Sequence, residues 1–218
     1  MIEQLIGFLY ALPGVLFALS IHEFSHGYVA YKLGDPTAKN FGRLTLNPMK
    51  HLDVFGAIAM LIVGVGWAKP VPVNTRYFKK YKRDTAFVAL AGPASNLISS
   101  FVGTFLYYLI IKIIMAVNKE IFMSPIWAGL SEILVSFIFV NVGLAVFNLI
   151  PVPPLDGSRI VDSFLPQKAL VAYHKYERYI SIILMVVVIS GFVSPYLQQA
   201  IYFIVGHIEN FVRFILKI

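Results

Sequence analysis

The pattern that most constrains this chain is a pair of histidines inside an apolar helix. An apolar run extends from about Leu5 to Tyr31, and its last third holds the sequence HEFSH. Because His22 and His26 are four residues apart, they lie on one face of a helix, one turn apart, where both imidazoles can bind one metal ion. Glu23 projects beside them. Two histidines leave a catalytic zinc ion short of ligands, so the fold must bring a further ligand to this face.

Composition places these histidines in a membrane rather than in a soluble core. Hydrophobic residues make up 58% of the chain, charged residues make up 13%, and the mean hydropathy is +0.76. Soluble domains are nearer ~45–50% apolar. Since a span needs about 20 apolar residues, the chain has room for about six segments, which predicts a single membrane-embedded domain over residues 1–218. The absence of cysteine excludes disulfide frameworks, thiolate metal sites and cysteine nucleophiles.

The apolar runs predict an all-α polytopic fold. After the first run, two further runs follow at about 85–117 and 126–150. A C-terminal helical pair is expected at about 179–215, split at Ser194-Pro195. An acidic residue and no basic residue precede the first run, so we interpret this run as a retained helix rather than a cleaved signal peptide.

The polar connection after the first run carries two smaller elements. Residues 41–46, FGRLTL, alternate in polarity and predict a short β-ribbon that Asn47-Pro48 ends. The apolar run 54–68 has about 15 residues, which is short for a span and favours a re-entrant or interfacial element. Both elements are therefore expected near residues 41–70.

Basic residues predict how the chain is oriented. In a membrane chain, a net charge of +7 encodes orientation and contact with the lipid bilayer, so we expect no nucleic-acid partner. Segments 32–84 and 151–178 are rich in Lys and Arg and are expected to be cytoplasmic, together with the tail that holds Arg213 and Lys217. The chain is then a multi-pass cell-membrane protein with its histidines toward the cytoplasmic side. A true span at 54–68 would invert everything after it.

The stretch 148–157, NLIPVPPLDG, supplies the best candidate for a third metal ligand. Its three prolines in four residues cannot continue the preceding helix and force extended backbone at its end. Near a membrane, such backbone is tolerated only where it is buried in protein or lines a wet cavity. A carboxylate from Asp156 then completes a His22, His26 and Asp156 set for zinc. Beside zinc, Glu23 is expected to take a proton from water and pass it to the leaving nitrogen, which is peptide-bond hydrolysis without an acyl-enzyme.

Two asparagines on apolar segments are candidates for contacts with a substrate. A buried amide donor can stabilise the oxyanion of a tetrahedral intermediate, and an amide on an apolar helix otherwise lacks an obvious reason. Asn148 is the candidate for catalysis and Asn96 the candidate for substrate binding. Alternatively, Asn148 only bonds a neighbouring helix, and Asn96 only satisfies backbone groups that Pro93 leaves open.

Three motifs together resemble the site-2 protease family of intramembrane zinc metalloproteases, in its short bacterial and archaeal members without appended domains. The motifs are HEFSH at 22–26, GPASN at 92–96 and the stretch 148–157, which is similar to the family's Asn/Pro-Asp-Gly motif. Their order and spacing are those of the family. The resemblance covers the three-helix catalytic core, about residues 5–160.

This resemblance implies an enzyme with one zinc ion per chain. Its expected substrates are transmembrane proteins or peptides, cleaved within or beside a transmembrane helix. The substrate is expected to be unwound and held as an added strand, for which the ribbon at 41–46 is the candidate. The implied site residues are His22, His26 and Asp156 as zinc ligands, Glu23 as the base and Asn148 near the scissile carbonyl.

Other interpretations remain open from the sequence. Asp156, which precedes a glycine, can instead cap a turn or the following helix. His51 is either an auxiliary metal residue or a solvated loop histidine. For the whole chain, the alternatives are a zinc- or proton-coupled transporter and an inactive, protease-like binder of transmembrane segments. The chain lacks the symmetric halves of a transporter, and its intact base and ligands argue against an inactive binder.

Overall fold

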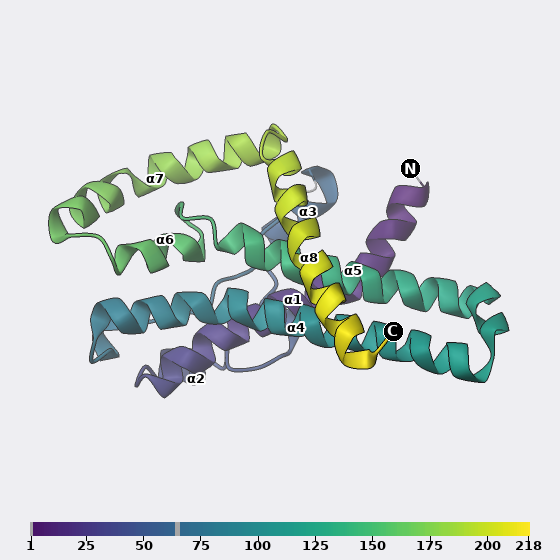
Figure 1. Ribbon diagram of the computed structural model, residues 1–218. Coiled ribbons are helices and arrows are strands. Elements are labelled where there is room, and N and C mark those ends of the chain that lie inside the picture. Colours follow the sequence, from purple (N-terminus) through teal and green to yellow (C-terminus); the bar gives the residue numbers. More distant parts are fainter. Residues whose placement is uncertain (1, 64–65) are drawn as a thin grey trace.

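Long helices dominate the computed structural model of the chain, which describes residues 2–63 and 66–218, without the side chains of 2–5, 61, 63, 167 and 172 (Figure 1). Within these described residues, three helices are long and apolar enough to cross a membrane, and a bent C-terminal pair can form a fourth span. The three are α1 (Ile2–Lys32), α4 (Tyr81–Val117) and α5 (Pro125–Asn148). They confirm the three predicted core helices to within a few residues.

Shorter helices and the C-terminal pair connect and flank these three. They are α2 (Thr37–Asn40), α3 (Val54–Val63), α6 (Asp156–Asp162), α7 (Gln167–Ile189), α8 (Ser194–Leu216) and the 3-10 turns η1 (Pro48–Lys50), η2 (Thr75–Tyr77) and η3 (Lys119–Met123).

Helix α1 ends two residues before Gly34. Gly34 has a φ of 107°, and the N–H of Asp35 donates to Ala30 O at 2.9 Å. This bond closes the helix in the manner of a glycine-terminated end. The Asp35 carboxylate is fully buried and accepts hydrogen bonds from the N–H groups of Thr37, at 2.9 Å, and Asn74, at 2.7 Å. It therefore ties the connection before α4 to the end of α1.

Helices α1, α4 and α5 pack against one another and form the core (Figure 1). At one crossing, Phe137 of α5 lies against glycines from both other helices. A Cβ built on Gly14 would lie 3.0 Å from Phe137 Cα, and one on Gly103 would lie 2.8 Å from the Phe137 ring. Small residues at these positions let the helices approach closely, as is common between membrane helices.

The segment around α3 is short in the residues that the structure describes. Helix α3 has 10 residues, which corresponds to about 15 Å, or half of the hydrocarbon thickness of a bilayer. An isolated antiparallel bridge joins Leu52 to Ala68, and the N–H of Lys69 donates to His51 O at 2.8 Å. The chain therefore leaves and returns at the same place, as expected for a re-entrant or interfacial element.

The predicted β-ribbon at 41–46 is wrong, because the residues that the structure describes contain no strand there. Gly42 instead ends α2: it has a φ of 64°, and the N–H of Arg43 donates to Ala38 O at 2.9 Å. This is a glycine-terminated helix end. The first residues of 41–46 thus form the end of α2, and this stretch pairs with no strand among the described residues.

The predicted C-terminal pair is present, but its break lies at residues 190–193 rather than at Ser194-Pro195, which are the first two residues of α8. Helices α7 and α8 meet at an angle of 82°. Val205 of α8 lies in a buried cluster with Ile138 and Val142 of α5, so α8 packs on the core.

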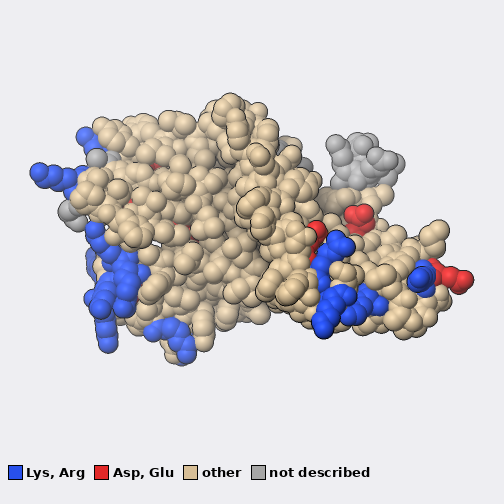
Figure 2. Space-filling model, in the orientation of Figure 1, with Lys and Arg blue, Asp and Glu red and all other residues tan. Residues whose placement is uncertain are grey.

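The expectation that the tail lies on the same side as the other basic residues is wrong. The Lys112 ammonium, near the end of α4, donates to Leu216 O, and Arg213 lies over the ring of Tyr108, at 5.8 Å from its centroid. The tail therefore lies beside the end of α4 that leads to η3. Figure 2 shows its basic side chains as a group separate from those at the other end of the molecule. The bend between α7 and α8 carries the chain there.

Candidate metal centre

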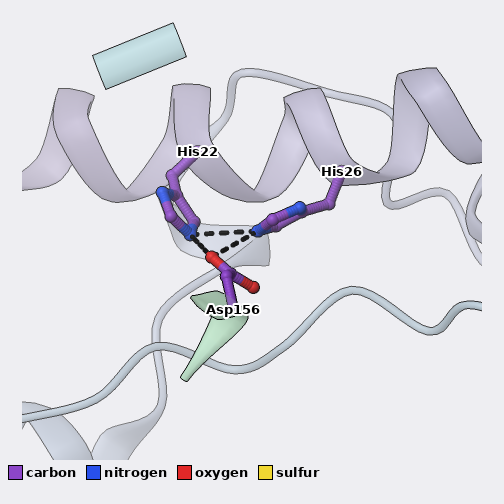
Figure 3. A group of neighbouring side chains, drawn as sticks. All are labelled: His22, His26 and Asp156. Carbon is purple, nitrogen blue, oxygen red and sulfur yellow. Dashed lines mark hydrogen bonds and ion pairs between the residues drawn. The ribbon is translucent and has the colours of Figure 1, made fainter. Parts of the chain in front are cut away.

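His22 and His26 lie on one face of α1 with their side chains buried among the core helices. Their exposed fractions are 4% and 8%, and their Nε2 atoms are 3.0 Å apart (Figure 3). The N–H on Nδ1 of His26 donates to the backbone oxygen of Val88, on α4, at 2.7 Å. Nδ1 of His22 lies 2.7 Å from Oδ1 of Asn96, also on α4. Helix α4 therefore orients both rings so that their Nε2 atoms point to the same place.

The third member of the group is Asp156, the first residue of α6. Its Oδ2 lies 3.0 Å from Nε2 of His22 and 3.2 Å from Nε2 of His26 (Figure 3). The proline-rich turn after α5 brings it there, as the sequence predicts. Gly157 packs directly on the backbone oxygens of Leu149 and Ile150, where a Cβ would not fit. This close packing brings α6 back against the end of α5 and holds Asp156 over the histidines.

These three side chains fit a metal cation. Both Nδ1 atoms face acceptor oxygens, which leaves lone pairs on both Nε2 atoms. These two lone pairs and the Asp156 carboxylate meet within 3.2 Å, and Oδ2 is buried with no hydrogen bond of good geometry from the described residues. A cation relieves this convergence of acceptors, and two imidazoles with one carboxylate are a common zinc ligand set.

Asp156 can supply the negative charge that this ligand set needs. A carboxylate binds a metal ion in its deprotonated form, and a cation between the three acceptors would favour that form. Among the described residues, His22, His26 and Asp156 are the group whose ligand atoms all lie within 4.8 Å of one another.

The position of Gly92, the first residue of the second motif, requires a glycine. A Cβ at this position of α4 would lie 2.5 Å from Nε2 of His26 and 2.6 Å from Cε1 of His22. Both distances are far inside van der Waals contact. The absence of a side chain at Gly92 therefore makes room for the two imidazoles between α1 and α4.

The structure places Asn96 differently from the sequence prediction. Its side chain is fully buried between helices, and the NH₂ group donates to Ala18 O of α1 and to Oδ1 of Asn141 of α5, both at 3.0 Å. Its Oδ1 faces His22. Asn96 is not among the described residues that line the cavity beside the histidines. It therefore contacts a candidate metal ligand rather than the space for a substrate.

A cavity of about 470 Å³ opens beside the histidines, and Glu23 and Asn148 both line it. Glu23 Oε2 accepts a hydrogen bond from the N–H of Val71 at 2.7 Å. The Asn148 NH₂ donates to Leu144 O of its own helix at 3.0 Å, so one of its two N–H groups has a partner. Both candidate catalytic side chains therefore face the same space as the metal centre.

His51 is not a solvated histidine, and its ring nitrogens lie beside groups other than the candidate metal ligands. It is 1% exposed, and its Nε2 lies 2.8 Å from the backbone oxygen of Thr45. Its Nδ1 lies 3.5 Å from Arg43, whose guanidinium donates to Lys69 O at 2.6 Å. His51 thus stabilises the connection between α2 and α3.

Four contributors to the site were missed from the sequence. The available signal for Asn141 was an amide on an apolar helix, and the backbone groups of Val71 and Val88 carry no signal in their side chains. Arg159, three residues after Asp156, also lines the cavity and lies 3.0 Å from Glu177 of α7. A helical spacing of three from the predicted ligand was the available signal for Arg159.

The model of Peptidase family M50 matches residues 10–192. Three related proteins carry the name "Putative zinc metalloprotease". YwhC of Bacillus subtilis (strain 168) is 43% identical over 186 residues, which is 85% of this chain and 81% of that protein. Rip2 of Mycolicibacterium smegmatis is 27% identical over 205 residues, 89% of this chain and 72% of that protein. MJ0611 of Methanocaldococcus jannaschii is 26% identical over 163 residues, 72% of this chain and 77% of that protein.

No solved structure matches the chain. The family model nevertheless spans most of its length, and YwhC is related to it over most of both proteins. With its membrane-spanning helices and a ligand set that suits zinc, this chain belongs to peptidase family M50 and is a multi-pass membrane zinc metalloprotease.

Proposed function

We propose that His22, His26 and Asp156 hold the zinc ion and that the enzyme cleaves membrane-anchored proteins within or next to their transmembrane segments. The observation that carries this proposal is the convergence of three acceptor atoms at the wall of a cavity that Glu23 and Asn148 also line. When bound there, zinc supplies Lewis-acid polarisation of the scissile carbonyl and of a water molecule.

Glu23 is the proposed base. The N–H of Val71 holds one oxygen of its carboxylate at 2.7 Å, which gives the carboxylate a fixed orientation in the cavity. From there Glu23 takes a proton from the attacking water and passes it to the leaving nitrogen. Asn148 is the proposed donor to the scissile carbonyl, since its amide has a second N–H beyond the one that binds Leu144 O.

The substrate is proposed to lie extended along the connection before η2. Pro70, Val71 and Val73 of this connection line the cavity, as does Thr75, the first residue of η2. Residues 69–74 belong to no helix, so their backbone is not enclosed by helical hydrogen bonds and can pair with an extended peptide. A peptide bond in a helix is enclosed by its own hydrogen bonds, so a transmembrane substrate must unwind before the bond reaches Glu23. This extended connection takes the place of the ribbon expected at 41–46.

We propose that the metal centre lies toward the cytoplasmic side. Of the 18 Lys and Arg residues, 14 fall in segments 32–83 and 159–178. Figure 2 shows a group of Lys and Arg side chains at the end where Figure 1 places α2, α6 and the start of α4. An excess of basic residues marks cytoplasmic segments, and the basic residues of the tail are too few to reverse this excess.

Zinc content and cleavage, measured together on purified protein in detergent, test the proposal. Glu23→Gln is expected to keep one zinc ion per chain and to slow cleavage of a transmembrane reporter by at least about 100-fold. Asp156→Ala is expected to lose both zinc and cleavage. His207→Ala, which removes an exposed histidine of α8, is the control and should change neither. Wild-type zinc affinity in Asp156→Ala, or wild-type turnover in Glu23→Gln, would refute these roles.

A further inference from the structure

Asn141 is a fully buried polar residue in the middle of α5. Its NH₂ group donates to the backbone oxygen of Phe137 at 2.9 Å, and its Oδ1 accepts from the NH₂ group of Asn96 at 3.0 Å. Asn96 in turn faces Nδ1 of His22 at 2.7 Å. A continuous chain of hydrogen bonds therefore crosses the core from α5 through α4 to the histidine on α1.

Two backbone oxygens fix the direction of this chain. The oxygens of Phe137 and Ala18 can only accept, so the NH₂ groups of Asn141 and Asn96 must face them. This orientation turns the Oδ1 of Asn141 toward Asn96 and the Oδ1 of Asn96 toward His22. Nδ1 of His22 must then carry the proton, which leaves the lone pair on Nε2 toward Asp156.

We propose that Asn141 is a positioning residue for zinc binding, acting on His22 through Asn96. The proposal rests on the zinc ligand set proposed above. Asn141 holds the Asn96 amide in the orientation that accepts from Nδ1, and this fixes both the tautomer and the ring angle of His22. Substitution of residues that support a metal ligand through hydrogen bonds commonly lowers metal affinity by about 10–100-fold.

The two histidines differ in what orients them. Nδ1 of His26 donates directly to the backbone of α4, at Val88 O, and no side-chain substitution removes that oxygen. His22 depends on the Asn96 side chain, whose amide is free to turn unless groups on both neighbouring helices hold it. Ala18 O supplies one such group from α1, and Asn141 supplies the other from α5. The zinc-binding tautomer of His22 therefore requires that all three core helices are in place.

The test is zinc affinity, measured on zinc-free protein in detergent by competition with a chelator. Asn141→Leu keeps the size of the side chain and removes its hydrogen bonds, and it is expected to weaken zinc binding by about tenfold. With zinc at saturation, kcat should fall while KM stays unchanged, because Asn141 and Asn96 lie outside the described lining of the cavity. Asn141→Ser, whose hydroxyl is too short to reach Asn96, is the second variant and should behave alike.

A matched control and a double variant separate positioning from packing. Ser100→Ala changes a fully buried residue of α4, one turn after Asn96, whose hydroxyl has no partner among the described residues; it should leave zinc affinity unchanged. If Asn141 acts through Asn96, adding Asn141→Leu to Asn96→Leu should cause no further loss of affinity.

Two outcomes would overturn the proposal: wild-type zinc affinity in both Asn141 variants, or losses that add in the double variant. If Asp156→Ala loses zinc as expected while the Asn141 variants keep it, only the positioning role of Asn141 is refuted. If Asp156→Ala itself keeps zinc, the ligand set fails.

Discussion

Replacing Gly92 by alanine should damage the metal centre more than any other single methyl group added to α4. The new Cβ would lie 2.5 Å from Nε2 of His26, whereas ordinary contact begins at 3.4 Å, so a ring or a helix must move by about 0.9 Å. The rings cannot turn away freely, because Val88 O and Asn96 Oδ1 hold their Nδ1 atoms. Metal–ligand distances tolerate only about 0.2 Å. We expect zinc affinity to fall by about 10–100-fold and cleavage at saturating zinc by about 100-fold.

Two other glycines provide controls for this substitution. Gly103 lies on α4, as Gly92 does, and Gly103→Ala places a Cβ 2.8 Å from the ring of Phe137 on α5. This variant should lower thermal stability in detergent but keep zinc. Gly206→Ala on α8 meets no atom within 4 Å and should change neither property. Chelator competition and cleavage of a transmembrane reporter are the assays. Wild-type zinc affinity and turnover in Gly92→Ala would refute the geometry of the site.

Three further substitutions test the surroundings of the centre. His51→Ala should lower the free energy of unfolding by about 2 kcal/mol with one zinc ion still bound; loss of zinc would show that His51 is a ligand after all. Asp35→Ala leaves two partly buried N–H groups without a charged acceptor and should destabilise the zinc-loaded protein by about 2 kcal/mol in thermal unfolding. Val71→Pro removes the N–H that holds Glu23 and should lower kcat by about tenfold at unchanged zinc content. Val71→Ala keeps this N–H and should leave kcat unchanged. Equal kcat values in the two variants would exclude a role of the Val71 N–H in orienting Glu23.

The core helices and the side chains that converge at the centre were predictable because each depends on local chemistry. Four-residue spacing on a helix is enough to bring His22 and His26 together. Prolines that stop α5 are enough to place Asp156 in a turn near the membrane surface. The turn between Gly34 and the next element likewise follows from a glycine at a helix end.

The partners of these side chains depend on how distant helices pack, which no local pattern contains. The sequence shows that Asn96 needs a hydrogen-bond partner but does not show that His22, 74 residues away, is that partner. The prediction of a ribbon at 41–46 was wrong because an alternation of polar and apolar residues also occurs where a glycine ends a helix. The position of the tail was wrong because counting charges takes no account of the 82° bend between α7 and α8.

The order of synthesis gives the position of Asp156 a further consequence. The ribosome makes His26 130 residues before Asp156, an interval of about ten seconds at typical rates of elongation. During that interval the histidine pair is already in the nascent chain while its carboxylate partner does not yet exist. The complete ligand set forms only after α4 and α5 have been inserted and the proline-rich turn has folded back. If the proposed ligand set is correct, a newly made protein therefore passes through a stage in which two of its zinc ligands are present and the third is not.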